Sequence, residues 1–206
     1  MMLRLALPRG RLFAETVELL LSRGVLNEKL EEGRKLFIKT GSLEVMLVKP
    51  SDVPVYVEGG VADLGVCGMD VLLERKPSVY RLLDLGLGYC KVVVAGRPES
   101  LTRYPNLSHL KVATKYPRLA REFFTKRGVK AEVYYLSGSV ELAPLVGLAE
   151  FILDLVQTGR TLKENGLVIV EEVAESTAWL IANKDSFRTK NAAVLELVRK
   201  LKGDGP

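Results

Sequence analysis

The chain has 206 residues, of which 48% are hydrophobic and 27% charged, and 30 Lys and Arg against 25 Asp and Glu give a formal net charge of +5. This composition provides a hydrophobic core and excludes a wholly disordered chain. The charge surplus is modest, and no stretch clusters Lys and Arg with aromatic residues. We therefore expect phosphate-bearing small molecules as ligands rather than nucleic acid.

The chain has two cysteines, Cys67 and Cys90, and one histidine, His109. Two cysteines are too few for a disulfide framework or a thiolate metal cage, and one histidine cannot form a multi-histidine metal site. The opening MMLRLALPRGR is charged by its fourth residue and lacks the apolar run of a signal peptide. No stretch reaches the roughly 18 apolar residues of a membrane span. We expect a cytoplasmic protein with no membrane contact.

Short β-rich runs alternate with segments of helical period in the first part of the chain. The expected strands are residues 3–7, 36–40, 43–48, 62–67, 80–87 and 90–95, and the expected helices are residues 11–24, 51–58 and 69–75. Gly24 ends the first helix, and a Gly41-Ser42 turn predicts a hairpin between the second and third strands. Ser51 is expected to cap the second helix.

The same alternation restarts after a polar stretch. The expected strands are residues 111–114, 131–136, 151–156, 167–173 and 178–182, and the expected helices are residues 117–127, 140–149, 158–165 and 186–202. Strand–helix alternation at this spacing predicts an α/β architecture with mostly parallel sheets. About a dozen strands in a chain of this length fit two sheets better than one. We expect a first lobe of residues 1–88 and 174–206, and a second lobe of residues 89–173.

One stretch, FILDLVQTGRTLKENG at 151–166, predicts a phosphate site. An apolar strand with a single acid, Asp154, leads into a T-G-R-T turn and a helix. Unsatisfied N–H groups at a helix N-terminus attract anions, Gly159 permits close backbone approach, and the threonine hydroxyls add donors. The alternative is a plain strand–turn–helix in which Thr158 caps the helix. Asp154 favours the ligand site, because a carboxylate in an apolar strand is costly without a partner.

An acid followed by T-G-x-T resembles the loop that binds phosphoribosyl diphosphate (PRPP) in phosphoribosyltransferases. The longer string LSGSVELAPLVGLAEFILDLVQTGRTLKENGL resembles the ATP phosphoribosyltransferase family of histidine biosynthesis. LALPRGRL, DVPVYVEGGVADLGVCGMDVL and VATKYPRLAREFF match that family in the same order, so the resemblance covers essentially the whole chain. The chain stops after its last helix, as in the short form, which works with a regulatory subunit related to histidyl-tRNA synthetase.

The resemblance implies a two-lobed fold like that of periplasmic binding proteins and a set of PRPP ligands. Asp154 would hold the ribose hydroxyls, and Glu141 would face the ribose or its Mg²⁺. The 5′-phosphate would bind at Thr158, Gly159, Arg160 and Thr161, with Arg160 contributing only its backbone, and Ser137, Gly138 and Ser139 would form a second turn. Many unrelated phosphoribosyltransferases carry two adjacent acids here, whereas Leu153 precedes Asp154; this departure agrees with the two-lobed fold.

The resemblance also implies ATP-binding residues, in the first lobe except for Cys90 at the crossover, each with an alternative. Arg9, Gly10 and Arg11 would meet triphosphate or diphosphate oxygens, or form a solvated basic turn. Arg34 would reach a phosphate or be a surface arginine. Asp70 would recognise the nucleotide or cap a helix, and Cys90 would line the adenine site or be a buried structural cysteine.

The implied reaction is pentosyl transfer from PRPP to N1 of ATP, with loss of pyrophosphate. The expected catalytic residues are Arg11, Glu141 and Asp154, and the expected metal is Mg²⁺. Positioning of the substrates and electrostatic stabilisation of the transition state would account for the rate acceleration. The family implies homodimers that assemble with the regulatory subunit into a hetero-octamer. The rival functions are a non-catalytic two-lobed binding or sensor protein and a transferase acting on another base.

Overall fold

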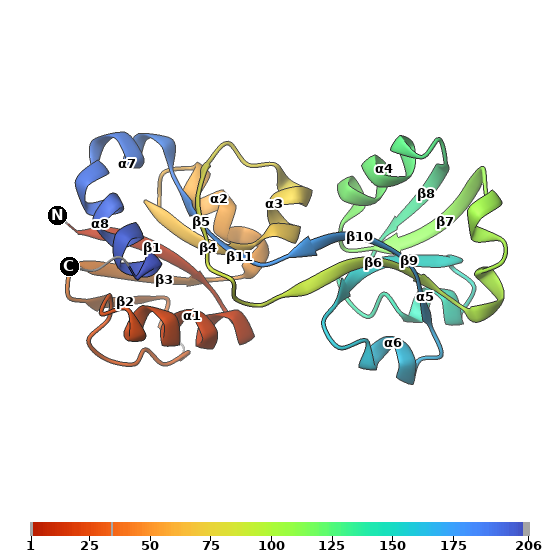
Figure 1. The fold of residues 1–206 in the computed structure, drawn as a ribbon, viewed down its shortest axis with the longest axis horizontal. Helices are drawn as coiled ribbons and strands as arrows, with labels where there is room; N and C mark the ends of the chain where they lie inside the picture. The colour runs from red at the N-terminus through yellow and green to blue at the C-terminus, as the bar shows by residue number, and fades with distance from the viewer. Residues whose placement is uncertain (1, 34, 204–206) are drawn as a thin grey trace. The chain divides into compact units, whose positions relative to one another are not determined.

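A computed structural model describes residues 2–33 and 35–203, and the chain divides into two compact units. Unit 1 comprises residues 1–89 and 177–206, and unit 2 comprises residues 90–176. The chain enters unit 2 between β5 (Tyr80–Asp84) and β6 (Cys90–Gly96), and returns between β10 (Val168–Ser176) and β11 (Ala178–Ala182) (Figure 1).

Unit 1 contains a six-stranded sheet in the order β2-β3-β1-β4-β11-β5. Besides β5 and β11, its strands are β1 (Leu3–Pro8), β2 (Phe37–Thr40), β3 (Leu43–Val48) and β4 (Leu64–Gly68). Its helices are α1 (Arg11–Ser22), the 3₁₀ turn η1 (Pro50–Asp52), α2 (Val53–Glu58), α3 (Met69–Arg75), α7 (Lys184–Thr189) and α8 (Asn191–Lys202). The expected hairpin is confirmed, because β2 pairs antiparallel with β3.

Helices cover both faces of this sheet. Side chains of a strand alternate between faces, so Leu5 of β1 packs in one core cluster with Val17 of α1 and Val194 of α8. Its neighbour Ala6 packs in another, with Val57 of α2. Burial on both faces explains why the central strands β4 and β11 read as continuous apolar runs.

Two helix predictions in unit 1 need correction. Ser51 does not cap α2: it lies in η1 and its Oγ donates to Asp52 Oδ1 at 3.0 Å. The expected helix 186–202 is two helices. The first begins after Asn183, whose side chain accepts hydrogen bonds from the N–H groups of Asp185 and Ser186, and the chain leaves the helical conformation at Lys190.

Unit 2 contains a five-stranded sheet in the order β10-β6-β9-β7-β8. Besides β6 and β10, its strands are β7 (His109–Thr114), β8 (Lys130–Tyr135) and β9 (Phe151–Val156). Its helices are η2 (Pro98–Ser100), η3 (Tyr104–Asn106), α4 (Pro117–Lys126), α5 (Leu142–Leu145) and α6 (Arg160–Glu164). One core cluster joins Ile152 of β9 to Ala143 of α5 and Leu162 of α6, which fixes both short helices against the sheet.

The helix expected over 140–149 is a single turn, α5, in the structure. Pro144 is its third residue and lacks an N–H, and Gly147 follows it with a φ of +75°. A residue in the left-handed region ends a helix. The apolar run 142–149 therefore predicts a helix of which only residues 142–145 are helical in the structure.

The sheets are mixed rather than mostly parallel: four of the nine strand pairings in the described residues are parallel. The segment between β5 and β6 takes the chain from the first sheet into the second, and the segment between β10 and β11 takes it back. The strands on either side of these segments pair antiparallel with their neighbours. Hydrophobic periodicity carries no information on strand direction.

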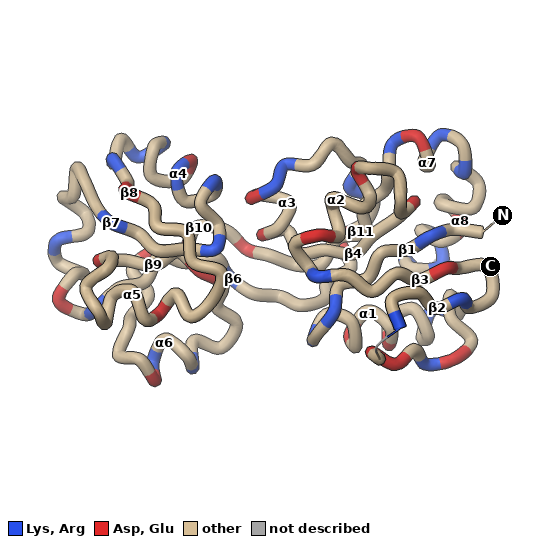
Figure 2. The backbone as a smooth tube through the Cα atoms, turned by 180° about the vertical axis from the view of Figure 1, so that it is seen from behind, with Lys and Arg blue, Asp and Glu red and all other residues tan. Residues whose placement is uncertain are grey.

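Lys and Arg are interspersed with Asp and Glu along the backbone of both units (Figure 2). Among the helices of the described residues, none has the length and apolar character that crossing a bilayer requires.

Candidate functional site

A cavity of about 280 Å³ lies in unit 2 at the end of β9. It is lined by Glu141, Asp154, Leu155, Val156, Gln157, Thr158, Gly159, Arg160, Thr161 and Leu162. The structure thus brings together, from two separate segments, most of the residues that the sequence analysis assigned to PRPP.

The cavity forms at the carboxyl edge of parallel strands. β7 pairs in parallel with β8 on one side and with β9 on the other, so the loops that follow β8 and β9 leave the sheet at the same edge. Ligands of open α/β sheets bind at this edge. Thr114, fully buried at the end of β7, ties it to β9 by donating from Oγ1 to the carbonyl of Leu153 at 2.6 Å. Asp154 is the next residue and is partly exposed.

The T-G-R-T turn leads from β9 into α6, which begins at Arg160 and is shorter than expected. Gly159 adopts φ 72° and ψ 2°, in the left-handed region that glycine tolerates best. Thr158 does not cap the helix. It precedes the cap residue Gly159, and its Oγ1 accepts a long 3.4 Å hydrogen bond from the N–H of Arg160. Both threonine hydroxyls and the first helical N–H groups therefore lie on one short, exposed segment.

Glu141 reaches the cavity from the loop between β8 and α5. Ser139 in this loop has a φ of +48°, a conformation that a residue other than glycine rarely adopts and that recurs at functional sites. Val140, between the two, is fully buried and belongs to the same core cluster as Leu162. The core therefore supports both segments of the cavity. Ser137, Gly138 and Ser139 are themselves exposed and do not line it.

The basic turn of unit 1 connects β1 to α1, as expected, but a carboxylate already occupies it. Glu32 Oε2 accepts a hydrogen bond from Gly10 N–H at 2.9 Å, and Glu32 Oε1 lies 3.6 Å from Arg9 Nη1. Arg9 Nη1 also donates to the carbonyl of Gly33 at 3.1 Å. An anion, here Glu32, binds where the sequence analysis placed phosphate oxygens.

The other ATP-side predictions fall at separate places in the fold. Arg11 is exposed and its Nε lies 3.4 Å from Glu15 Oε1. Arg34 lies outside the described residues. Asp70 is buried in the first turn of α3, but the cap residue is Gly68, so Asp70 is not the helix cap. Cys90 is buried at the start of β6, with Sγ 3.8 Å from the carbonyl of Ser176.

Gln157 and Glu32 are the polar residues at these sites that sequence reasoning missed. Gln157 lines the cavity beside Thr158, and its adjacency to the turn could have identified it. Glu32 contacts Gly10 across 22 residues of sequence, and its segment has no strand or helix pattern. No local signal could have revealed that contact.

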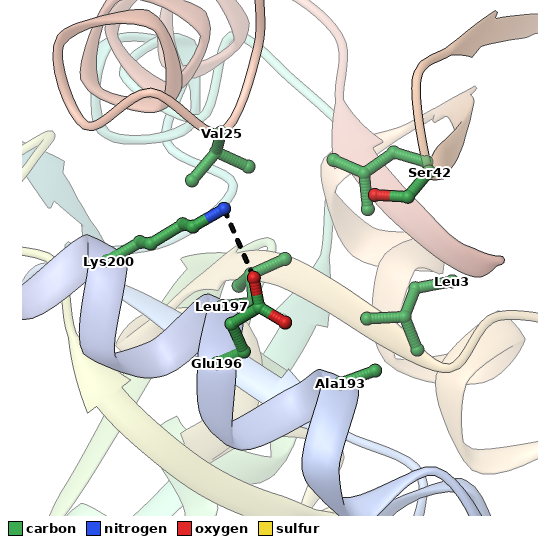
Figure 3. Close-up of a pocket in the computed structure, with 8 residues that line it drawn as sticks. Leu3, Val25, Ser42, Ala193, Glu196, Leu197 and Lys200 are labelled. Atoms are coloured by element: carbon green, nitrogen blue, oxygen red, sulfur yellow. Dashed lines mark ion pairs between the residues drawn. The ribbon is translucent and has the colours of Figure 1, made fainter. Parts of the chain in front are cut away.

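Unit 1 also has a cavity of about 320 Å³, among Leu3, Ser42 and the side of α8 (Figure 3). Its charged groups are Glu196 and Lys200, which lie one turn apart on α8 and pair at 3.2 Å. Such an exposed pair contributes little to binding or stability. None of the predicted site residues that the structure describes lines this cavity.

No cluster of three or more His, Cys, Asp or Glu side chains that could hold a metal ion occurs within the part of the chain that the structure describes. Two carboxylates, of Glu141 and Asp154, line the cavity in unit 2. Mg²⁺ commonly binds through one or two carboxylates together with substrate phosphates. This donor set fits a magnesium ion that arrives with its substrate.

Comparison with known proteins gives consistent matches. The family described as "HisG: ATP phosphoribosyltransferase" matches residues 49–203. The ATP phosphoribosyltransferase of Aquifex aeolicus (strain VF5) is 66% identical over 200 residues, which cover 97% of this chain and 94% of that protein. The corresponding enzyme of Caldanaerobacter subterraneus is 50% identical and covers 96% of this chain and 95% of its own length.

Solved structures agree with these matches. The ATP phosphoribosyl transferase (HisG:HisZ) complex from Thermotoga maritima contains a chain that superposes with a TM-score of 0.84, at 34% identity and 98% coverage of both chains. The periplasmic aliphatic sulphonate binding protein SsuA from Escherichia coli superposes with a TM-score of 0.62 at 15% identity, covering 97% of this chain and 70% of its own. The second likeness concerns the fold alone and confirms the expected fold class. On the sequence matches and the first superposition, the chain belongs to the ATP phosphoribosyltransferase family.

Proposed function

We propose that the chain transfers the phosphoribosyl group of PRPP to N1 of ATP, the first step of histidine biosynthesis, and that the cavity of unit 2 binds PRPP. The site assignment rests on one observation: Asp154, Glu141 and the T-G-R-T turn line the same cavity. Asp154 accepts hydrogen bonds from the ribose hydroxyls. The hydroxyls of Thr158 and Thr161, with the backbone N–H groups around Gly159, hold the 5′-phosphate.

The exposed turn Ser137–Ser139 contributes further donors to PRPP. Its residues lie next to Glu141 in sequence, and the left-handed φ of Ser139 gives the turn a defined shape. Glu141 faces the ribose or its metal. Mg²⁺ would be held by Glu141 and Asp154 together with the diphosphate oxygens, where it would neutralise charge on the leaving pyrophosphate.

The phosphates of ATP bind to unit 1 in this proposal, and Cys90, the first residue of unit 2, is the one assigned residue outside unit 1. Arg9, Gly10 and Arg11 hold its phosphates, Arg34 reaches a phosphate, and Asp70 and Cys90 contribute to the nucleotide site. The association of Gly10 and Arg9 with Glu32 supports this assignment, because it shows that the turn accommodates an anionic group. ATP must displace that carboxylate in order to bind there.

The chemistry needs no strong general base. Adenine N1 has a free lone pair at neutral pH and attacks C1 of the ribose with inversion, while pyrophosphate leaves. Positive charge grows on the sugar in an oxocarbenium-like transition state, and Asp154 and Glu141 stabilise it electrostatically. Arg11 stabilises negative charge on the phosphates. The remaining contribution is the positioning of two bound substrates.

The proposed partner is a regulatory subunit related to histidyl-tRNA synthetase, which the Thermotoga maritima HisG:HisZ complex supports. We propose that homodimers of this chain assemble with it into a hetero-octamer. We propose that the enzyme acts in the cytoplasm.

A direct assay tests the proposal. Purified protein is mixed with ATP, PRPP and Mg²⁺, and phosphoribosyl-ATP and pyrophosphate are measured. Formation of both in equal amounts supports the transferase. ATP and PRPP that bind but stay unconverted, with the regulatory subunit present, would indicate a binding protein, and conversion of a different base would indicate a different transferase.

A further inference from the structure

The carboxylate of Glu15, on α1, connects the basic turn to the segment through which the chain leaves unit 1. Its Oε1 lies 3.4 Å from Arg11 Nε. Its Oε2 accepts a hydrogen bond of 2.9 Å from the N–H of Gly88, 73 residues further along the chain. The Glu15 side chain is one-third exposed. One carboxylate is therefore shared between a cation of the proposed ATP site and a backbone amide.

Gly88 belongs to the linker 86–89, which connects β5 to the first residue of unit 2. Gly86 and Gly88 both have positive φ, of 66° and 62°. A Cβ on Gly88 would lie 3.1 Å from Leu12 Cδ1, so the linker runs close against α1. Ala178 N–H donates to the carbonyl of Leu87 at 2.9 Å, and Gly86 N–H donates to Asp84 Oδ1 at 2.9 Å. The bond from Gly88 to Glu15 adds a side-chain contact that connects the linker to α1.

We propose that Glu15 is a positioning residue that couples phosphate binding at Arg11 to the order of the linker 86–89. The inference rests on the proposed role of Arg11 in binding ATP. Phosphate and carboxylate compete for the same guanidinium, which can bind a phosphate through two parallel hydrogen bonds. The existing Glu15 pair is partly exposed, with its oxygen 3.4 Å from Arg11 Nε, and holds the guanidinium weakly. Once Arg11 turns to phosphate, Glu15 loses the cation that orients it and faces a second anion.

The consequence for the linker follows from this competition. A Glu side chain without its ion pair recovers rotamer freedom, and repulsion from phosphate draws its carboxylate away from Gly88. The Gly88 amide then loses its acceptor for part of the time. Uptake of ATP therefore loosens the segment that leads into the PRPP-binding unit, which lets the linker change conformation when the substrate is bound.

Amide hydrogen exchange at Gly88, followed by NMR with and without saturating ATP, tests the coupling. In the unmodified protein we expect ATP to speed this exchange about fivefold, which corresponds to the loss of one ordinary hydrogen bond. Glu15→Ala should exchange fast in both states. Glu15→Gln keeps an oxygen for Gly88 but has no ion pair with Arg11, so Gly88 should already exchange faster than in the ATP-free unmodified protein and should no longer respond to ATP.

Two further variants distinguish a failure of the coupling from a failure of the proposed role of Arg11 in ATP binding. Glu18→Gln removes a charge from an exposed position of the same helix and should respond like the unmodified protein. Arg11→Ala should weaken ATP binding and abolish the response. If Arg11→Ala weakens ATP binding while Gly88 of the unmodified protein ignores ATP, or if Glu15→Gln still responds, the coupling alone is wrong. If Arg11→Ala binds ATP normally, the role of Arg11 fails, and the coupling with it.

Discussion

Lys190 Nζ lies 2.8 Å from Asp63 Oδ2 and joins the break between α7 and α8 to the residue before β4. Asp63 is 6% exposed and also accepts hydrogen bonds from Arg4 N–H at 2.8 Å and from the Ser186 hydroxyl at 2.7 Å. Burial alone would raise the pKa of this carboxyl. The hydrogen bonds from Lys190, Arg4 and Ser186 outweigh it and hold the pKa below its ordinary value.

The lowered pKa of Asp63 makes the stability of unit 1 depend on pH in a definite direction. A carboxylate with a lower pKa in the folded state stabilises the fold above its unfolded pKa, about 3.9, and this contribution is lost as the pH falls through the folded value. Urea unfolding between pH 7 and pH 3 should show the free energy of unfolding decreasing below about pH 5.

Asp63→Asn tests the assignment of that decrease to one group. It should lower the free energy of unfolding at pH 7 by roughly 1–3 kcal/mol, because an amide pairs poorly with Lys190, and it should flatten the acid decrease. Asp185→Asn, at a side chain 84% exposed, serves as control and should keep the decrease. An unchanged pH profile in Asp63→Asn would assign the acid sensitivity to other carboxylates.

The proposed PRPP site makes Thr161 and Asp154 essential for binding without making them essential for folding. Thr161→Ala or Asp154→Ala should abolish PRPP binding in a calorimetric titration, because the ligand loses a phosphate donor or its ribose acceptor. Both residues lie at the surface of the cavity, so the far-UV spectrum should be unchanged. Lys163→Ala, on the same helix but outside the cavity, should bind normally. Tight PRPP binding by the first two variants would mean that the turn is misassigned.

Some helices and strands could be predicted closely, because hydrophobic periodicity is a local property of the sequence. The expected strand 151–156 and the expected helix 69–75 have the same bounds in the structure. Asp154 stood out because it interrupts an apolar run, and T-G-R-T because its residue types suit a phosphate. The resemblance to a family then supplied the ligand, which no pattern of hydrophobicity contains.

The contacts that complete the sites could not be predicted, because they join residues far apart in the chain. Glu32 contacts Gly10 and Glu15 contacts Gly88 only through the fold. The same limit applies to strand direction. The length of α5 is a different case, because Pro144 and Gly147 are local helix breakers inside the apolar run and could have predicted the short helix. Burial patterns show which residues face a core, but not which neighbour they meet there.

Removal of the Glu32 charge should strengthen ATP binding. In Glu32→Gln the carboxylate no longer competes with phosphate for Gly10 N–H and Arg9. Because the pair is about one-third exposed, its contribution is modest, and we expect the KM for ATP to fall by up to about fivefold, equivalent to about 1 kcal/mol. Glu31→Gln, the adjacent exposed acid, should leave the KM unchanged. A higher KM in Glu32→Gln would instead make Glu32 a contributor to the ATP site.

The backbone of the T-G-R-T turn can be tested separately from its side chains. In Gly159→Ala the new Cβ meets only Val156 Cγ1, at 3.9 Å, so the cost is the left-handed φ itself, about 1–2 kcal/mol of unfolding free energy. Gly166→Ala is the matched control: its φ is +66°, nothing lies within 4 Å, and it does not line the cavity. Both variants should lose similar stability in thermal unfolding, but only Gly159→Ala should bind PRPP more weakly, because its displaced N–H groups no longer meet the phosphate. Equal PRPP affinity in the two would show that this backbone does not hold the ligand.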